Sequence, residues 1–216
     1  MKPIRLPIVV VLVLAGPGML RAQSAADHGT FVLLHAHDTV AVEQFSRGPT
    51  RLEGTLSLRN AKQTSERYSA VIAPDATLPL VEVTVREGTD SGPRKAKVVQ
   101  RARVIFKQDS AAVDEVGGAG LMTRVFGTQA GAVPYLNLSF ALLEQAIRRA
   151  RVTPGGSMVS LFNLGGGQTI DARVSPLGSD SLKLDIGDIQ FHLRVDSTGR
   201  LVGGRIPAQN VVVERK

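Results

Sequence analysis

Two histidines at strand spacing are the residues of this sequence that best suit metal chemistry. His35 and His37 lie two positions apart, and residues two apart on a β-strand share one face, so both imidazoles can reach a single metal ion. A third ligand would come from Glu43 on the next strand, or from Asp27 and His28 just upstream. The same segment is typical of a hairpin turn, where polar residues are expected for backbone reasons. The turn is therefore the favoured interpretation, and a metal-dependent hydrolase using His35 and His37 stays an alternative.

The usual signatures of nucleophilic catalysis and nucleotide binding are missing. The sequence has no G-x-S-x-G elbow and no S-x-x-K motif, and it contains no cysteine, which leaves no recognisable activated nucleophile. Asp185 and Asp188 bracket a tight turn instead of facing each other across a cleft. The glycine clusters at 117–120 and 165–167 lack the strand–turn–helix context of a nucleotide site. We therefore expect no cofactor, and we favour a protein that is not an enzyme.

The first 22 residues are typical of a secretory signal peptide. Lys2 and Arg5 precede an apolar run over 8–14, which is followed by a Gly/Pro break and a small residue at Ala22. Cleavage is expected after Ala22 or Ala26. The apolar run is shorter than the roughly 20 residues that a spanning helix needs. We therefore expect a periplasmic or secreted protein whose mature chain has no transmembrane span.

Composition excludes some partners. The net charge of +7 for the whole chain falls to +4 once the three basic residues of 1–22 are removed. The remaining basic residues are scattered, Trp is absent and only two Tyr are present, whereas nucleic-acid binding favours a basic stripe with stacking aromatics. We expect no nucleic-acid partner. Because no disulfide is available, stability must come from packing.

Most of the chain after residue 29 alternates apolar and polar residues with a period of two. Leu182, Leu184 and Ile186 alternate with polar residues, and a Gly-Asp pair at 187–188 then suits a two-residue hairpin turn. This pattern is typical of antiparallel strands with one face to a core and one to water. It predicts an N-terminal meander over 29–115 and a C-terminal meander over 156–214.

One segment, from Tyr135 to Arg151, has helical spacing instead. Basic residues gather at its end, where a helix C-terminus favours cations. The apolar stripe and the basic end are formed by Leu136, Phe140, Leu143, Ile147, Arg148, Arg149 and Arg151. The loop and helix therefore occupy 116–151, and the apolar stripe is expected to be buried against the sheet.

These elements predict a mainly β fold. We expect residues 23–216 to form a single all-β domain, a strongly curved antiparallel sheet or part-closed barrel of about 10–12 strands, with one buried α-helix across its concave side. If helix and sheet leave space between them, that space is a cavity for a hydrophobic ligand. If they do not, the same residues are simply a core.

Two hairpin-like stretches run from 29 to 45 and from 195 to 209, and the second contains the Asp196-Ser197-Thr198-Gly199-Arg200 turn. Both resemble parts of exported bacterial domains of unknown function of the DUF3108 and DUF6134 kind. The resemblance implies an envelope protein built as a curved antiparallel sheet, similar in style to the unclosed barrels of lipoprotein carriers. It implies no catalytic residue, and the chain departs from the pattern at 35–38, where those families place a glycine-rich turn.

Taken together, the sequence favours an exported, non-enzymatic β-protein that binds a hydrophobic or amphipathic envelope molecule such as a lipid. Leu136, Phe140, Leu143 and Ile147 would line the cavity, while Arg148 and Arg151 would meet an anionic head group at its rim. Besides the metal-dependent hydrolase, a structural or partner-binding envelope module remains an alternative. The sequence names neither a protein partner nor an oligomeric state.

Overall fold

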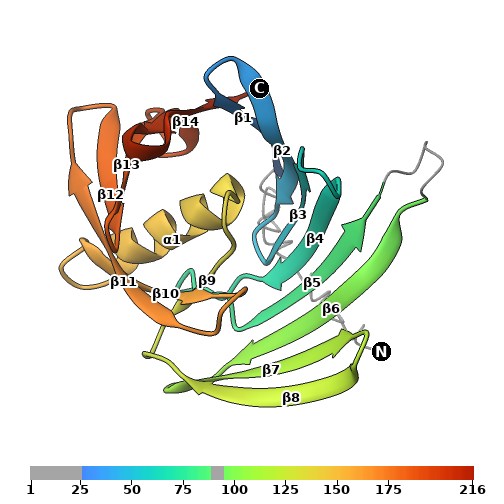
Figure 1. Cartoon of the computed structure of the whole chain (residues 1–216). Helices are drawn as coiled ribbons and strands as arrows, with labels where there is room; N and C mark the ends of the chain where they lie inside the picture. The colour runs from blue at the N-terminus through green and yellow to red at the C-terminus, as the bar shows by residue number, and fades with distance from the viewer. Residues whose placement is uncertain (1–25, 89–94) are drawn as a thin grey trace, which may run out of the picture.

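The computed structural model of this protein describes residues 26–88 and 95–216. Its strands form one strongly curved sheet around a helix (Figure 1). The predicted signal peptide at 1–22, with its cleavage position at Ala22, lies outside the described residues.

The N-terminal half of the chain is an uninterrupted antiparallel meander of eight strands. The strands are β1 (Asp27–His35), β2 (Asp38–Arg47), β3 (Arg51–Leu58), β4 (Thr64–Val71), β5 (Leu80–Glu87), β6 (Lys97–Phe106), β7 (Ser110–Gly117) and β8 (Gly120–Gly127).

The chain then forms a short strand and the helix before it returns as a second meander. The elements are β9 (Val133–Tyr135), α1 (Phe140–Val152), β10 (Met158–Asn163), β11 (Thr169–Pro176), β12 (Ser181–Ile186), β13 (Ile189–Val195), β14 (Leu201–Ile206), the 3-10 helix η1 (Pro207–Gln209) and β15 (Val211–Arg215).

The two meanders join through the ends of the described chain, because β15 pairs with β1. The resulting strand order is β8-β7-β6-β5-β4-β3-β2-β1-β15-β14-β13-β12-β11-β10-β9. Every pairing is antiparallel except that of β9 with β10. The sheet is not closed, since β8 and β9 are its two edges. The mainly β, strongly curved fold is confirmed, with fifteen strands in the described residues where the sequence indicated about 10–12.

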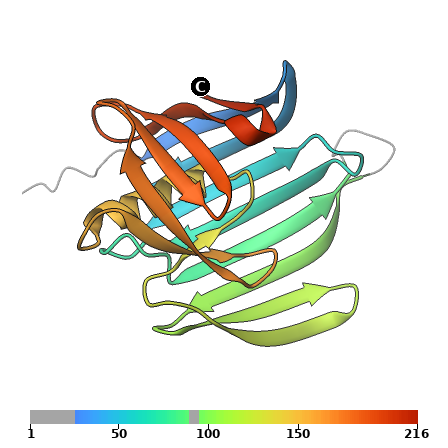
Figure 2. The same cartoon turned by 60° about the vertical axis from the view of Figure 1, so that its left-hand side comes forward.

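The predicted alternation places the core on the concave face. Leu182, Leu184 and Ile186 are buried while the residues between them are only partly covered, and Gly187 takes a positive φ in the turn that follows. Helix α1 lies inside the curve, with the C-terminal strands in front of it and the N-terminal sheet behind (Figure 2).

The helix begins later than its apolar spacing indicated. Tyr135 belongs to β9, and Leu138 adopts a positive φ in the turn before the helix. Ser139 is the N-cap, whose side chain accepts a hydrogen bond from Leu142 N at 3.3 Å. Leu136 therefore lies in the turn before the helix and not on it, because the preceding residue, Tyr135, is the last residue of β9.

The predicted cavity-lining residues are part of a filled core. Phe140 packs against Phe31 and Phe191 at ring-centroid distances of 5.8 and 6.3 Å, and these rings occupy the space between helix and sheet. Leu136, Leu143 and Ile147 are buried in the same cluster. None of the four lines any of the five main pockets of the described residues. The packing of these aromatic rings therefore favours the interpretation of these residues as a core over their interpretation as a cavity lining.

A glycine on the concave face makes room for one large buried side chain. Gly54 is directly opposite Tyr68 in register, and a Cβ on Gly54 would overlap the Tyr68 hydroxyl oxygen. The tyrosine therefore lies across Gly54 and reaches Glu43 on β2, to which its hydroxyl donates at 2.6 Å.

We expect Gly54→Ala to lower the free energy of unfolding by about 1–3 kcal/mol, the usual cost of overpacking a core. Gly118→Ala is the matched control, because no atom lies within 4 Å of a Cβ built there, and it should change stability by less than about 0.5 kcal/mol. Urea unfolding of the three proteins measures both effects. Equal stability of the two variants would contradict the role assigned to Gly54.

Candidate functional site

A buried carboxylate on β2 holds the start of the helix. Glu43 accepts hydrogen bonds from the Ser139 and Tyr68 hydroxyls through Oε1. Its Oε2 accepts from the backbone amides of Phe140 and Ala141 at 2.7 and 3.0 Å. These amides are among the first four of the helix, which have no partner within it, and the helix dipole favours a negative group there. Glu43 therefore fixes the helix to the sheet.

Burial sets the protonation of this contact. Desolvation raises the pKa of the Glu43 carboxyl above its ordinary value, while the hydrogen bonds from Ser139, Tyr68 and the two amides lower it in part. Burial, together with the neighbouring Glu43, also raises the pKa of Tyr68 well above the ordinary value. Because Glu43 is completely buried, we assign it a structural role and no contact with solutes.

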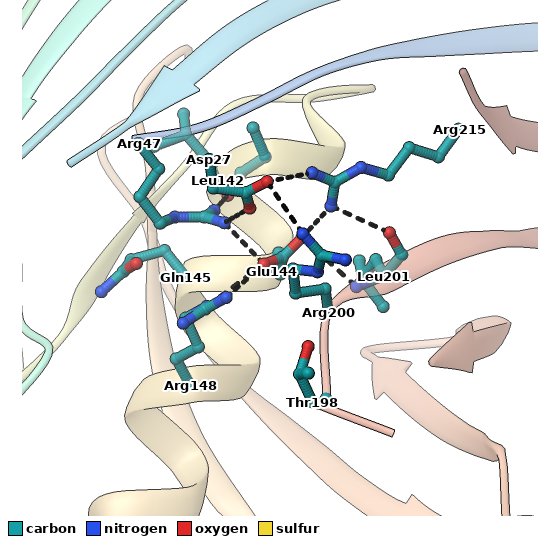
Figure 3. A network of polar contacts seen from close by, with 12 residues as sticks. Asp27, Arg47, Leu142, Glu144, Gln145, Arg148, Thr198, Arg200, Leu201 and Arg215 are labelled. Atoms are coloured by element: carbon teal, nitrogen blue, oxygen red, sulfur yellow. Dashed lines mark hydrogen bonds and ion pairs between the residues drawn. The ribbon is translucent and has the colours of Figure 1, made fainter. Parts of the chain in front are cut away.

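A second buried carboxylate, Glu144 on the helix, gathers guanidinium groups from three elements (Figure 3). Its Oε1 accepts from Arg47 of β2 and from Arg148 one turn further along the helix, the latter at 2.8 Å. Its Oε2 accepts from Leu201 N at 3.3 Å and lies 3.4 Å from Arg215 Nη1. Glu144 therefore joins β2, β14 and β15 to the helix.

Asp27 at the start of β1 extends this network. Its Oδ1 accepts from Arg215 at 2.6 Å and lies 3.5 Å from Arg200 Nη1. Its Oδ2 lies 3.7 Å from Arg47 Nη1, which is beyond hydrogen-bond range. Arg200 also pairs with Asp196 at 2.9 Å in the turn before β14. Four arginines, Arg47, Arg148, Arg200 and Arg215, thus share three carboxylates and leave a net charge of +1.

A pocket of about 580 Å³ opens at this network, between the last turns of the helix and the loops that follow β2 and β4. We call it the arginine pocket. Both polar and apolar residues line it: Asp27, Arg47, Gly48, Pro49, Ile72, Ala73, Pro74, Ala76, Gln145, Arg148, Arg151, Val152 and Arg200. A volume of this size lies within the range of small-molecule sites, roughly 300–1,000 Å³.

Three buried polar atoms in the pocket lining have no hydrogen-bond partner among the described residues. They are the donor Arg47 Nε and the acceptors Gln145 Oε1 and Asp27 Oδ2. The Gln145 amide is oriented by its Nε2, which donates to Ala76 O at 3.0 Å. The Arg47 and Gln145 side chains are more than nine-tenths buried. Such unpaired groups are costly in a folded protein unless a water or a ligand satisfies them.

Burial also acts on Arg47 itself. Desolvation lowers the pKa of its guanidinium from the ordinary value, and the negative charge of Glu144 opposes that effect. The ordinary value for arginine is so high that the group stays charged in neutral solution. The pocket wall is therefore cationic.

The structure brings together only part of the residues predicted from sequence. Arg148 and Arg151 both line the arginine pocket. Arg149 points elsewhere and pairs with Asp75 at 3.3 Å. Leu136, Phe140, Leu143 and Ile147 are in the core, and whether any of them contacts a ligand stays a prediction.

The two histidines lie at the far end of the first hairpin. His35 ends β1 opposite Asp38, so the turn consists of Ala36 and His37. Both histidines are exposed, whereas Glu43 points into the core. No group of three or more His, Cys, Asp or Glu side chains lies within metal-binding distance in residues 26–88 and 95–216. The predicted third ligands therefore do not join this pair.

Sequence reasoning missed Arg47, Gln145 and Arg200 as pocket residues. A signal for Arg47 exists, because Ala41, Glu43, Phe45 and Arg47 share the inward parity of β2. A charged residue at an inward strand position must be paired or functional. Arg200 carries no comparable signal, since it lies in the turn before β14. Gln145 lies on α1, and only the packing of the helix against the loop after β4 brings it to the pocket.

Comparisons with known proteins support the fold and indicate no function. No protein-family model matches this chain, and no curated protein matches it significantly. A crystal structure of a DUF1089 family protein from Pseudomonas aeruginosa is similar, with 12% sequence identity and a TM-score of 0.54. The match covers 80% of this chain and 91% of that protein. At this identity the likeness concerns the fold alone. The DUF3108 or DUF6134 resemblance is supported only as far as a domain of unknown function.

The helix is short relative to the thickness of a membrane. In the part of the chain that the structure describes, no helix is both long and apolar enough to span a bilayer.

Glu43→Gln tests the protonation of the helix contact. The folded-state pKa is raised, so the folded protein binds the proton more tightly than the unfolded chain, whose carboxyl titrates near 4.5. The wild-type contribution is fully present below that pH and decreases as the pH rises through the folded-state pKa. We expect the Glu43→Gln variant to be less stable than wild type by more at pH 4.5 than at pH 8, measured by urea unfolding. A difference that does not change with pH would contradict the raised pKa.

Glu144→Gln tests the buried ion network. Removing one charge from a buried pair costs about 3–5 kcal/mol, because the partner charges stay buried, so a large loss of unfolding free energy is expected. Lys62→Met is the control, since its pair with Glu87 is exposed on both sides and should contribute about 1 kcal/mol or less. Thermal and urea unfolding measure both variants. Similar small losses for the two would show that the network is not a stabilising centre.

Proposed function

We propose that this protein is exported and binds an anionic, amphipathic envelope molecule in the arginine pocket, without catalysis. The observation that carries the proposal is the lining of the pocket. A surplus of guanidinium groups and three buried, unpartnered polar atoms form one wall, and apolar side chains form another. Export is supported by the signal-like order of residues 1–22.

The cationic wall favours a phosphate or carboxylate. Arginine presents a planar fork of donors that matches the oxygens of both groups. Arg151 makes no ion pair in the described residues and is held by Gly199 O at 3.0 Å, so its remaining donors are free to meet an anion. Arg47 lines the same pocket, and its buried Nε is a further donor without an acceptor.

The unpartnered acceptor Gln145 Oε1 restricts which ligand head groups fit the pocket. Gln145 Oε1 requires a donor, which an anion alone does not supply. A hydroxyl next to the acidic group, as in a glycerophosphate or an acidic sugar, satisfies both Gln145 Oε1 and Arg47 Nε. We therefore propose a hydroxylated anionic head group.

The apolar wall accounts for the amphipathic half of the ligand. Pro49, Ile72, Pro74 and Val152 face the pocket from two loops and the helix end. About 580 Å³ accommodates a head group and the carbons next to it. The rest of a long chain would extend past Val152, which is exposed.

Calorimetric titration with lysophosphatidylglycerol below its micelle concentration tests this function. We expect binding that weakens at least about tenfold in an Arg148→Gln/Arg151→Gln double variant, since a hydrogen bond to a charged group contributes about 1.5–3 kcal/mol. An Arg173→Gln/Arg194→Gln variant, changed at exposed positions of β11 and β13, removes the same two charges and should bind like wild type.

Two further titrants separate the possible sources of the anion. Lysophosphatidylcholine carries the same apolar chain without net charge and should bind more weakly. Inorganic phosphate lacks both chain and hydroxylated head, and should also bind more weakly. Phosphate binding as tight as the lipid, or no loss in the double variant, would refute the proposal.

A further inference from the structure

The edge strand β8 lacks the features that protect sheet edges. It is eight residues long, contains no proline and one charge, and pairs with β7 without a register shift. Leu121 and Val125 are 71% and 70% exposed. In Figures 1 and 2, β8 forms the lower margin of the sheet, with no described segment beyond it. Natural edges are usually blocked by charge, proline or bulges, because free backbone groups recruit another strand.

The hairpin geometry identifies which backbone groups are free. Gly118 and Ala119 form the turn, and even-numbered residues of this strand bond toward β7, as Thr128 N does to Asp109 O at 2.8 Å. Because direction alternates along a strand, the amides and carbonyls of Leu121, Thr123 and Val125 point away from β7. These three residues supply the hydrogen-bonding edge.

The sequence of this edge is complementary to itself in one register. A twofold axis at Thr123 places Leu121 opposite Val125 of a second copy, and Thr123 opposite its own equivalent. Both pairs keep the same face of the sheet, as pairing requires, and apolar and Thr–Thr pairs are favourable across strands. All the residues with free backbone groups then bond in pairs, about six hydrogen bonds in all.

Charge also favours this register. Arg124 lies opposite Met122 of the second copy, not opposite its own equivalent. Beyond Met122 of the second copy, on the same face of the sheet, lies Glu115 of that copy, because Glu115 pairs with Met122 between β7 and β8. Arg124 of one copy and Glu115 of the second copy are then two strands apart. Their backbones are separated by about 10 Å, a distance that the two side chains are long enough to bridge. Neither residue forms an ion pair within one copy of the described chain.

We propose that β8 pairs with β8 of a second copy of this chain, antiparallel about a twofold axis at Thr123, so that the two sheets become one. The contact is isologous, so it closes at two copies. It lies on the opposite edge of the N-terminal meander from the arginine pocket and does not depend on the proposed ligand.

Cysteine cross-linking tests the axis, and the chain contains no natural cysteine to interfere. Facing residues of a hydrogen-bonded pair have Cα atoms about 5.5 Å apart, which suits a disulfide. With diamide as the oxidant, Thr123→Cys should form a covalent dimer. Ser57→Cys, exposed on β3 inside the sheet, is the control and should form no covalent dimer.

Mixed cross-linking tests the register. Leu121→Cys and Val125→Cys proteins should cross-link to each other when mixed, and much less within either sample alone, because like positions are then about 13 Å apart along the strand. Equal cross-linking in the mixed and separate samples would overturn the register.

A charge at the axis tests the contact without cysteine. Light scattering of wild type should give twice the mass of one chain, and Thr123→Lys should give one, because like charges directly opposite repel. Ser57→Lys should remain dimeric. A monomeric wild type, or a dimer unaffected by Thr123→Lys, would overturn the proposal.

Discussion

The contact between the Glu43 carboxylate and the first amides of the helix is the constraint on which the rest of this structure depends. A curved sheet with one helix in its hollow can place that helix in several rotations, because apolar packing has no direction. Hydrogen bonds do have direction, and those of Glu43 with Ser139, Phe140 and Ala141 fix both the position and the rotation of the first turn. Once the first turn is fixed, the later positions of the helix follow.

One strand then determines the geometry of the arginine pocket. Glu43 and Arg47 share the inward face of β2, and Arg47 bonds both Ala141 O and Glu144. The carboxylate anchors the start of the helix, and the guanidinium anchors its middle. Gln145, Arg148 and Arg151 are presented to the pocket because the helix cannot turn. The pocket wall is thus a consequence of two polar contacts made elsewhere in the core.

The sequence predicted the fold better than the site. Alternation in runs such as Leu182–Ile186 depends on local pattern, so the strands, the turn at Gly187 and the burial of the helix are found in the structure. The cavity depended on whether Phe31, Phe140 and Phe191 fill the hollow, and packing of distant rings has no local signature. Arg148 could be predicted because it belongs to a basic helix end. Its approach to Arg47 could not, because both bind Glu144 and Arg47 is about a hundred positions away in the sequence.

The adjacency of β1 and β15 makes the network a late product of folding. Arg215 lies between Asp27 and Glu144 and against the Phe31 and Phe45 rings, so this corner assembles only when strands from opposite ends of the described chain meet. Long-range pairing of this kind is slow, because loop closure must precede the contacts that compensate for it. A chain that has not yet paired β1 with β15 therefore lacks the finished arginine pocket.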